Sequence, residues 1–436
     1  MFAARLAARL ERRGIHYAWA VAAITFVAML VTSAALGLPG ALLQPMSSEF
    51  GWSTAELSAV FATRFALYGL LGPFAAVVLL RYGVARVVAF ASALIAVALL
   101  LGTRMHDIGQ AFVLWGLGLG VGSGLTAMVL GATVVNRWFV QRRGLVMGLL
   151  AASSATGQLM FLPLAAWLIE HHGWRVALLP VTAAAAVVAL LAWLFVASSP
   201  DAVGQRPYGA APDWAPPASA ARADWGLPFR TLAEAARVPT FWVLAATFFV
   251  CGLSTNGLVQ THFISLCGDH GLGPVPAASV LSMMGACDLV GTTLSGYLSD
   301  RFDNRKLLFC YYGLRGLSLL WLPYLQFTLS GLGLFAVFYG LDWIATVPPT
   351  VKLAGARFGA ERAGLIFGWV FAAHQLGAAT AAYGAGLMRS LLDTYSPSLF
   401  IAGVACLGAA LAILLVRAKP PLLPAAAPAA AAYSER

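Results

Sequence analysis

The sequence predicts an all-α membrane protein whose twelve transmembrane helices form two six-helix halves. Its 436 residues are 60% hydrophobic and only 10% charged, whereas a soluble domain carries about 25% charge. Apolar runs long enough to cross a bilayer recur along the whole chain. One long interruption, residues 199–239 with seven prolines, falls near the middle and divides these runs into two sets.

Each predicted helix is an apolar run of about 20 or more residues. The first run follows a basic stretch, MFAARLAARLERRG, but is too long for the apolar core of a signal peptide, so it counts as a span. The twelve runs are 18–43, 54–80, 84–103, 108–136, 143–169, 174–198, 240–267, 276–301, 305–327, 331–357, 361–390 and 396–417.

These runs define the expected domain organisation. Residues 1–198 form an N-terminal six-helix bundle, 199–239 a cytoplasmic linker, and 240–417 a C-terminal six-helix bundle. The last segment, 418–436, is rich in alanine and proline and is expected to be a disordered cytoplasmic tail.

The net charge of +10 reflects membrane orientation. Of the 27 Lys and Arg residues, 22 lie in the two terminal segments and in the connections on the same side of the membrane. The opposite connections hold only Arg104, Arg175 and Arg389. The positive-inside rule therefore predicts cytoplasmic termini, and this distribution argues against nucleic-acid binding. The Ala/Leu/Arg-rich composition favours a bacterial inner membrane.

Two segments 220 positions apart indicate an internal duplication. Residues 296–306 read GYLSDRFDNRK and residues 76–86 read AVVLLRYGVAR. The second copy resembles the cytoplasmic loop motif of the major facilitator superfamily; the first has Ala76 for the glycine and Leu80 for the aspartate. The resemblance implies a gate at the motif residues Gly296, Asp300, Arg301, Arg305 and Lys306.

The stretch 138–175 resembles the monocarboxylate transporter family and the related oxalate/formate antiporters. Trp138, Phe139, Arg142, Arg143, Leu145 and Gly148 match the start of that family's fifth helix. The resemblance assigns Arg142 and Arg143 to the cytoplasmic gate. Two family cations are absent from their usual places, where this sequence has Thr292 and Gly40.

Five ionisable residues lie near the middle of predicted spans: Arg64, Asp288, Arg315, Asp342 and His374. A charge at the centre of a membrane helix costs about 2.5–3.5 kcal/mol or more, so such residues face a cavity or a partner. We predict that Arg64 binds an anionic substrate in place of the missing helix 8 arginine, within the same cavity as Asp288. Its guanidinium matches a carboxylate with paired donors. Structural ion pairing is the alternative role.

The other residues of this set are candidates for coupling. Asp288, Asp342 and His374 are predicted to carry protons. His374 is also a candidate substrate ligand, and a hydrogen-bonded packing histidine is its alternative role. Arg315 is expected to form a structural ion pair with Asp288 or Asp342. Asn256 and Gln260 share one face of helix 7 and are either substrate ligands or helix-packing residues.

The resemblance and these residues together predict a proton-coupled symporter for a small organic anion, a monocarboxylate, working by alternating access as a monomer. Its partners are then the anion, protons and the bilayer. The alternatives are a carboxylate exchanger, an exporter of a hydrophobic compound, and a non-transporting membrane sensor. An enzyme is not expected, and no motif implies a metal or another cofactor.

Overall fold

The computed structural model describes residues 2–126, 128–211 and 224–416. Within these ranges the chain is helical apart from short connections and one isolated backbone bridge between Phe139 and Tyr208. The predicted tail, 418–436, and the linker residues 212–223 lie outside the described part of the chain.

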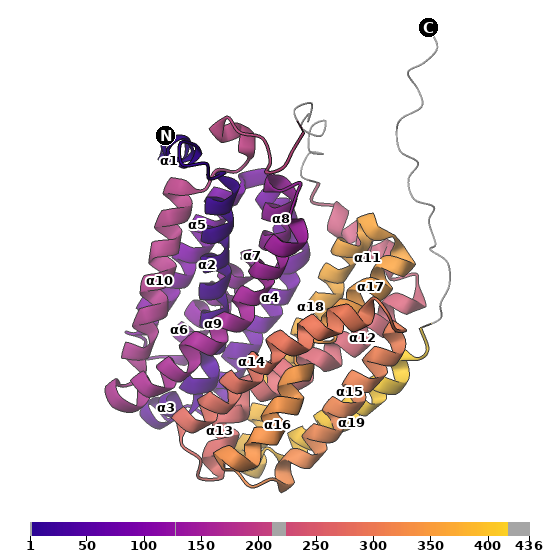
Figure 1. The fold of residues 1–436 in the computed structure, drawn as a ribbon. Helices are drawn as coiled ribbons and strands as arrows, with labels where there is room; N and C mark the ends of the chain where they lie inside the picture. The colour runs from indigo at the N-terminus through magenta and orange to yellow at the C-terminus, as the bar shows by residue number, and fades with distance from the viewer. Residues whose placement is uncertain (1, 127, 212–223, 417–436) are drawn as a thin grey trace.

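The first bundle contains the helices up to residue 195 (Figure 1). They are α1 (Phe2–Glu11), α2 (Ala18–Gly37), α3 (Pro39–Phe50), α4 (Thr54–Tyr82), α5 (Val84–Gly102), α6 (Ile108–Ala111), the π-helical turn η1 (Phe112–Gly118), α7 (Leu119–Leu125), α8 (Met128–Trp138), α9 (Arg143–His172) and α10 (Trp174–Phe195).

The second bundle follows the connection that contains η2 (Pro200–Val203) and α11 (Leu227–Ala235). Its elements are α12 (Pro239–Gly252), the π-helical turn η3 (Leu253–Gln260), α13 (Thr261–Asp269), α14 (Pro274–Ser299), α15 (Asn304–Trp321), η4 (Leu322–Tyr324), α16 (Leu329–Asp342), α17 (Val347–Phe358), α18 (Ala360–Leu392) and α19 (Ser396–Ile413).

These elements make twelve membrane-spanning helices. Ten helical segments of the described chain are long and apolar enough to span a bilayer. The other two are α9, with 30 residues, and α15, whose 18 residues include Arg305, Lys306 and Arg315. Four of these spans combine two or more helical elements: α2 with α3, α6 through α8, α12 through α13, and α16 with α17.

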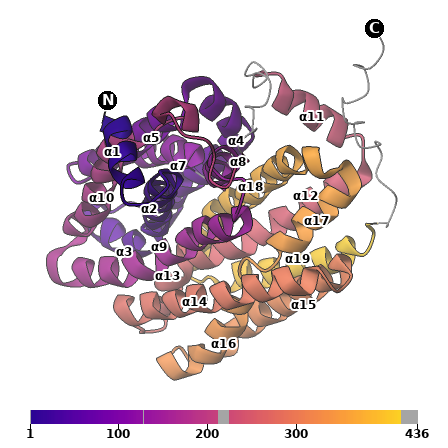
Figure 2. The ribbon, with the colours of Figure 1, turned by 45° about the horizontal axis from the view of Figure 1, so that its top comes forward.

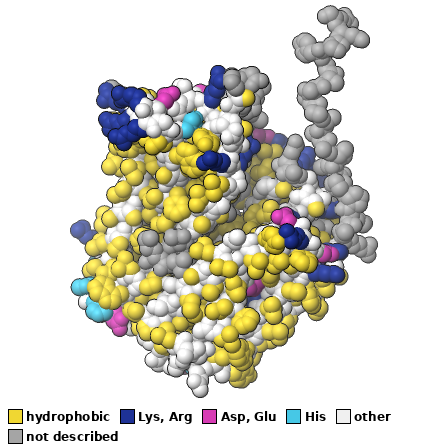
Figure 3. All heavy atoms as spheres, viewed as in Figure 1, with side chains coloured by type: hydrophobic (Ala, Val, Ile, Leu, Met, Phe, Trp, Pro, Cys, Tyr) yellow, Lys and Arg dark blue, Asp and Glu magenta, His cyan; other side chains and the backbone are white. Residues whose placement is uncertain are grey.

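The two bundles lie side by side (Figures 1 and 2). Three helix pairs join them: α4 with α18, α9 with α14, and α3 with α13. The bundles diverge on the side that carries α1 and α11, which we term the α1 side. The space-filling surface is hollowed between the bundles towards that side (Figure 3). The structure is therefore closed at α3 and α13 and open on the α1 side.

The glycine run 116–124, GLGLGVGSG, brings three helices into close contact. A Cβ atom at Gly120 would lie 2.9 Å from the Leu67 side chain on α4, and one at Gly122 would lie 2.7 Å from Ile95 on α5. Successive glycines of the run thus face α4 and α5 alternately. Larger residues would force both neighbours away, because real Cβ atoms do not approach this closely.

The connection between the bundles is partly ordered against the first bundle. Tyr208 donates its backbone N–H to the Trp138 carbonyl at 2.8 Å and accepts from Val140 N at 2.9 Å. Its ring packs against Trp19 and Phe139. The described parts of the predicted solvated linker therefore include a docked segment and the short helix α11.

Candidate functional site

Arg64 lies near the middle of α4 and is only 1% exposed. Its Nε and Nη1 atoms are buried and have no hydrogen-bond partner among the described residues. The guanidinium carbon instead lies 4.6 Å from the centre of the Phe65 ring and 5.8 Å from that of Phe61. Aromatic faces stabilise a cation by about 0.5–2 kcal/mol, which does not replace the hydrogen bonds that water would supply. The geometry leaves a buried cation with free donors.

Aromatic rings connect the face of α4 that carries Arg64 to α18 in the other bundle. Tyr68, one turn along α4, packs edge-on against Phe371 of α18 with ring centres 5.6 Å apart. Phe371 stacks on His374 at 5.7 Å, and the Nδ1 atom of this buried histidine has no hydrogen-bond partner. Arg64 and His374 thus lie on opposite sides of one aromatic contact between the bundles.

The backbones of α4 and α18 approach closely beside this contact. A Cβ atom at Gly69 would lie 2.5 Å from the Gln375 Cβ. The Gln375 side chain is 1% exposed, and its Oε1 atom lacks a hydrogen-bond partner. An unsatisfied polar group therefore lies at the contact of α4 with α18, whereas the neighbouring His374 ring packs against Phe248 of α12.

Arg315, by contrast, is fully paired. Its Nε atom donates to Asp342 Oδ2 at 2.6 Å, and its Nη2 atom donates to the Asp342 carbonyl at 2.5 Å. Its Nη1 atom contacts Cys251 Sγ at 2.9 Å. Of the two partners considered for Arg315, the structure pairs it with Asp342. One carboxylate oxygen of Asp342, Oδ1, is left without a partner.

Asp288 binds the short turn at residues 343–346 that interrupts the span between α16 and α17. Its Oδ1 atom accepts hydrogen bonds from Ile344 N and Thr292 Oγ1, both at 2.8 Å. In the described structure no ion pair joins Asp288 to Arg64 or to Arg315. The carboxylate therefore satisfies a backbone N–H that the broken helix cannot, and the expected shared cavity of Asp288 and Arg64 is not formed by direct contact.

Further side chains bind the same interruption from neighbouring helices. Ser295 on α14 donates to the Ala345 carbonyl at 2.5 Å, and Arg315 also donates to the Trp343 carbonyl at 3.2 Å. Thr346 lies 3.3 Å from Cys251 of α12. Irregular backbone persists at membrane depth only where the protein supplies such partners. The interruption is thus held by α12, α14 and α15 together.

The two helix 7 candidates lie on the π-helical turn η3, at the contact with the first bundle. The Gln260 side chain donates to the Leu36 carbonyl at 3.4 Å, and its Oε1 atom has no partner. A Cβ at Gly40 would lie 2.6 Å from the Gln260 carbonyl oxygen. Asn256 is half-buried, and its carbonyl accepts from Thr261 Oγ1 at 2.8 Å. Gln260 therefore joins the bundles on their closed side.

Two acidic residues of the second loop motif form ion pairs. Asp300 forms an ion pair with Lys352 of α17, and Arg305 pairs with Asp303 at 2.6 Å and donates to the Val416 carbonyl. Arg301 lies over the Tyr297 ring. Lys306 forms no ion pair within the described residues. Gly296 has open space at its Cβ position.

Arg142 and Arg143 lie at the start of α9 on the α1 side. Arg142 has a left-handed backbone with φ of 60° and lies over the Tyr208 ring. Arg143 donates from Nε to the Phe139 carbonyl at 2.5 Å. Both are tied to the loop that the connection between the bundles contacts, and the structure places neither beside Arg64.

Sequence reasoning missed the neutral residues around the buried charges. Tyr68 could have been found, since it is four residues from Arg64 and so shares its helix face. Phe371 and Gln375 flank His374 in a run that gives no signal beyond apolarity. Across the described chain no three His, Cys, Asp or Glu residues lie close enough to hold a metal ion.

Comparison with known proteins identifies the family. The sequence model of the Major Facilitator Superfamily matches residues 21–382, and a second match covers 266–435. The chain belongs to this superfamily. It is 26% identical over 389 residues to monocarboxylate transporter 13 of Rattus norvegicus, a match that covers 89% of this chain and 86% of the relative. Within the superfamily it is therefore related to the monocarboxylate transporters.

Two further similarities extend the comparison. The chain is 24% identical to the fujikurins efflux protein of Gibberella fujikuroi, with 83% of this chain and 72% of the relative covered. It also superposes with a TM-score of 0.71 on a bacterial homologue of the human lysosomal transporter Spinster, solved in an inward-facing and occupied conformation. That match covers 92% of this chain and 96% of the other at 14% identity, and so shows a shared fold.

Proposed function

We propose that this transporter carries a small organic anion, a monocarboxylate, together with protons by alternating access. The observation that carries the proposal is Arg64, a buried guanidinium with free donors at the contact between the two bundles. In this superfamily architecture substrates bind near the membrane midplane between the halves. An unpaired cation there needs an anion to offset its burial.

The surroundings of Arg64 suit a carboxylate attached to an apolar group. The Nε and Nη1 nitrogens lack partners and are free to donate charge-assisted hydrogen bonds to a carboxylate. Phe61, Phe65 and Tyr68 supply aromatic surface on the same helix. His374 and Gln375 supply unsatisfied polar atoms on α18, and Asn256 and Gln260 remain secondary ligand candidates. Related monocarboxylate transporters agree with this substrate class.

Proton coupling in this proposal depends on Asp342 more than on Asp288. Asp342 is desolvated, has one free oxygen, and holds Arg315 with the other. Protonation would weaken that ion pair and leave Arg315 held by Cys251 and by the backbone carbonyls of Asp342 and Trp343. Asp288 and His374 remain alternative proton carriers. We further propose that the transporter acts as a monomer in a bacterial inner membrane and that the α1 side, with both termini, faces the cytoplasm.

The test is uptake of labelled lactate, pyruvate and branched or aromatic carboxylates into proteoliposomes, with and without an inward proton gradient. We expect gradient-driven uptake of at least one acid by the wild type. Asp342→Asn should abolish the gradient dependence but retain exchange, because a neutral side chain mimics the protonated state. If gradient-driven uptake survives in Asp342→Asn but fails in His374→Gln, the proton-carrying role belongs to His374 instead of Asp342. Failure to transport any carboxylate would contradict the substrate class.

Exchange or efflux is the second candidate, favoured by similarity to the fujikurins efflux protein. Counterflow of labelled carboxylate without any proton gradient would identify exchange. Transport of a neutral hydrophobic compound, unaffected by Arg64→Gln, would identify efflux and assign Arg64 a structural role. Saturable binding without flux would identify a sensor.

A further inference from the structure

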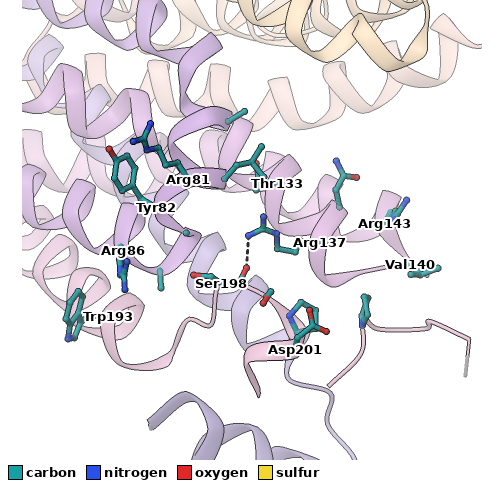
Figure 4. Close-up of a pocket in the computed structure, with 18 residues that line it drawn as sticks. Arg81, Tyr82, Arg86, Thr133, Arg137, Val140, Arg143, Trp193, Ser198 and Asp201 are labelled. Carbon is teal, nitrogen blue, oxygen red and sulfur yellow. Dashed lines mark hydrogen bonds between the residues drawn. The ribbon is translucent and has the colours of Figure 1, made fainter. Parts of the chain in front are cut away.

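A cavity lies on the α1 side of the first bundle, away from Arg64. Its volume is about 1110 Å³, and it lies between the ends of α4, α8 and α10 and the connection after α10 (Figure 4). Four arginines line it: Arg81, Arg86, Arg137 and Arg143. Of the lining residues only Asp201 is acidic, so the cavity is strongly cationic.

None of the four arginines forms an ion pair within the described chain. Arg137 donates to the Ser198 carbonyl at 2.8 Å, which Figure 4 shows as a dashed line. Arg81 lies over the Tyr82 and Trp225 rings. These contacts orient the side chains but leave their charge uncompensated. Several cations gathered in one cavity repel one another unless an anion binds there.

The internal repeat shows that the first copy has fewer carboxylates than the second. At an offset of 220 positions, Asp300 and Asp303 of the second copy correspond to Leu80 and Gly83 of the first. In the second copy these carboxylates bind Lys352 and Arg305. The cations that they bind correspond to Ala132 and Ala85, whereas Arg81 and Arg86 of the first copy correspond to Arg301 and Lys306. The first copy thus keeps two arginines without a carboxylate at either position, and Asp201 is the one acidic residue that lines the cavity.

Exposed aromatic side chains indicate where the cavity lies relative to the bilayer. Trp193, near the end of α10, is 67% exposed, and Tyr82, at the end of α4, is 50% exposed. Both line the cavity beside Arg86 and Arg81 (Figure 4). Exposed Trp and Tyr at helix ends mark the interface between the bilayer and water. The arginines thus lie at the level of lipid headgroups.

We infer that this cavity binds the phosphate group of an anionic ligand, with a phospholipid headgroup as the source that the exposed aromatic residues favour. Guanidinium groups bind phosphate with paired, charge-assisted hydrogen bonds, and clustered arginines at a membrane surface attract anionic lipids. This site is independent of the transported substrate.

The experiment is native mass spectrometry of the full chain in detergent with phosphatidylglycerol, cardiolipin or phosphatidylcholine. The double variant Arg81→Gln/Arg86→Gln removes two cavity charges. The matched control Arg5→Gln/Arg9→Gln removes two exposed charges from α1 on the same side. A third variant, Leu80→Asp, restores a carboxylate of the second copy. A parallel arm measures thermal stabilisation by glycerol 3-phosphate and inorganic phosphate.

We expect retention of anionic lipid to fall about tenfold in Arg81→Gln/Arg86→Gln, to fall in Leu80→Asp, and to remain within about twofold in the control. Stabilisation by soluble phosphate that is lost only in the cavity variants would support the site and assign a soluble source. The proposal would be overturned if retention of anionic lipid fell equally in the cavity and control variants or fell in neither. It would also be overturned if the wild type retained phosphatidylcholine as well as the anionic lipids.

Discussion

Two arginines are buried near the middle of membrane helices, and they differ in their hydrogen bonding. Arg315 and Arg64 are each 1% exposed. Arg315 contacts a carboxylate, two backbone carbonyls and a thiol. Arg64 has two aromatic rings near its guanidinium and two nitrogens without hydrogen-bond partners.

From this difference we infer that Arg315 is a structural charge, whereas Arg64 has the proposed substrate-binding role. Removing one member of a buried ion pair leaves the other uncompensated and costs much stability, whereas removing an unpaired charge relieves a burial cost. A chain that retains the unpaired charge has another use for it. The following predictions test the contrast, from the largest expected effect to the smallest.

Replacement of Arg315 should destabilise the protein most. Arg315→Met leaves the Asp342 carboxylate buried without its cation, and we expect a loss of about 3–5 kcal/mol in stability. Thermal denaturation in detergent, followed by the loss of monodisperse protein, measures the change. The double variant Arg315→Met/Asp342→Leu should recover a large part of it. Equal stability of the single variant and the wild type would show that the pair does not support the fold.

Replacement of Arg64 should affect transport without destabilising the fold. We expect Arg64→Gln to reduce carboxylate uptake by about 100-fold, equivalent to about 2.7 kcal/mol, because a charge-assisted paired contact is lost. Its melting temperature should equal or exceed that of the wild type. Arg64→Lys, which keeps the charge but not the paired donors, should retain part of the uptake. If Arg64→Gln destabilised the protein as much as Arg315→Met, the proposed difference in role between the two arginines would be wrong.

The interruption near Arg315 should be moderately sensitive to its supporting hydroxyl. Ser295→Ala removes the hydrogen bond to the buried Ala345 carbonyl, and we expect a loss of about 1 kcal/mol. Ser279→Ala is the matched control, since that exposed hydroxyl bonds only within its own helix. Thermal denaturation of both variants provides the measurement, and equal effects would contradict a specific role for Ser295.

The smallest effect is expected at Asp303, where the charge pair is partly exposed. The hydrogen bond from Arg305 holds the pKa of Asp303 below its ordinary value. The pair therefore contributes stability above the unfolded pKa of about 3.9 and loses it as pH falls through the lower folded pKa. Asp303→Asn should cost less than about 1 kcal/mol at pH 7. The difference from wild type, measured by thermal denaturation, should vanish in acid; a constant difference would assign it to helix capping.

The spans could be predicted from sequence because each depends on local composition. Crossing a bilayer requires about 20 apolar residues, and this requirement is visible without knowledge of neighbours. The glycine run 116–124 lies within one of these apolar runs and packs closely against α4 and α5. Arg64 and Arg315 were recognisable as unusual, since charge within an apolar run is costly wherever the helix packs.

The sequence by itself thus determined the membrane class, the helices and the set of buried charges. Only the tertiary structure decided which of these charges are paired. Arg315 lies 27 positions from Asp342, and Ile344 lies 56 positions from Asp288, so no local pattern links them. Partner choice depends on helix rotation and on the interruption between α16 and α17, which are set by packing among helices distant in sequence.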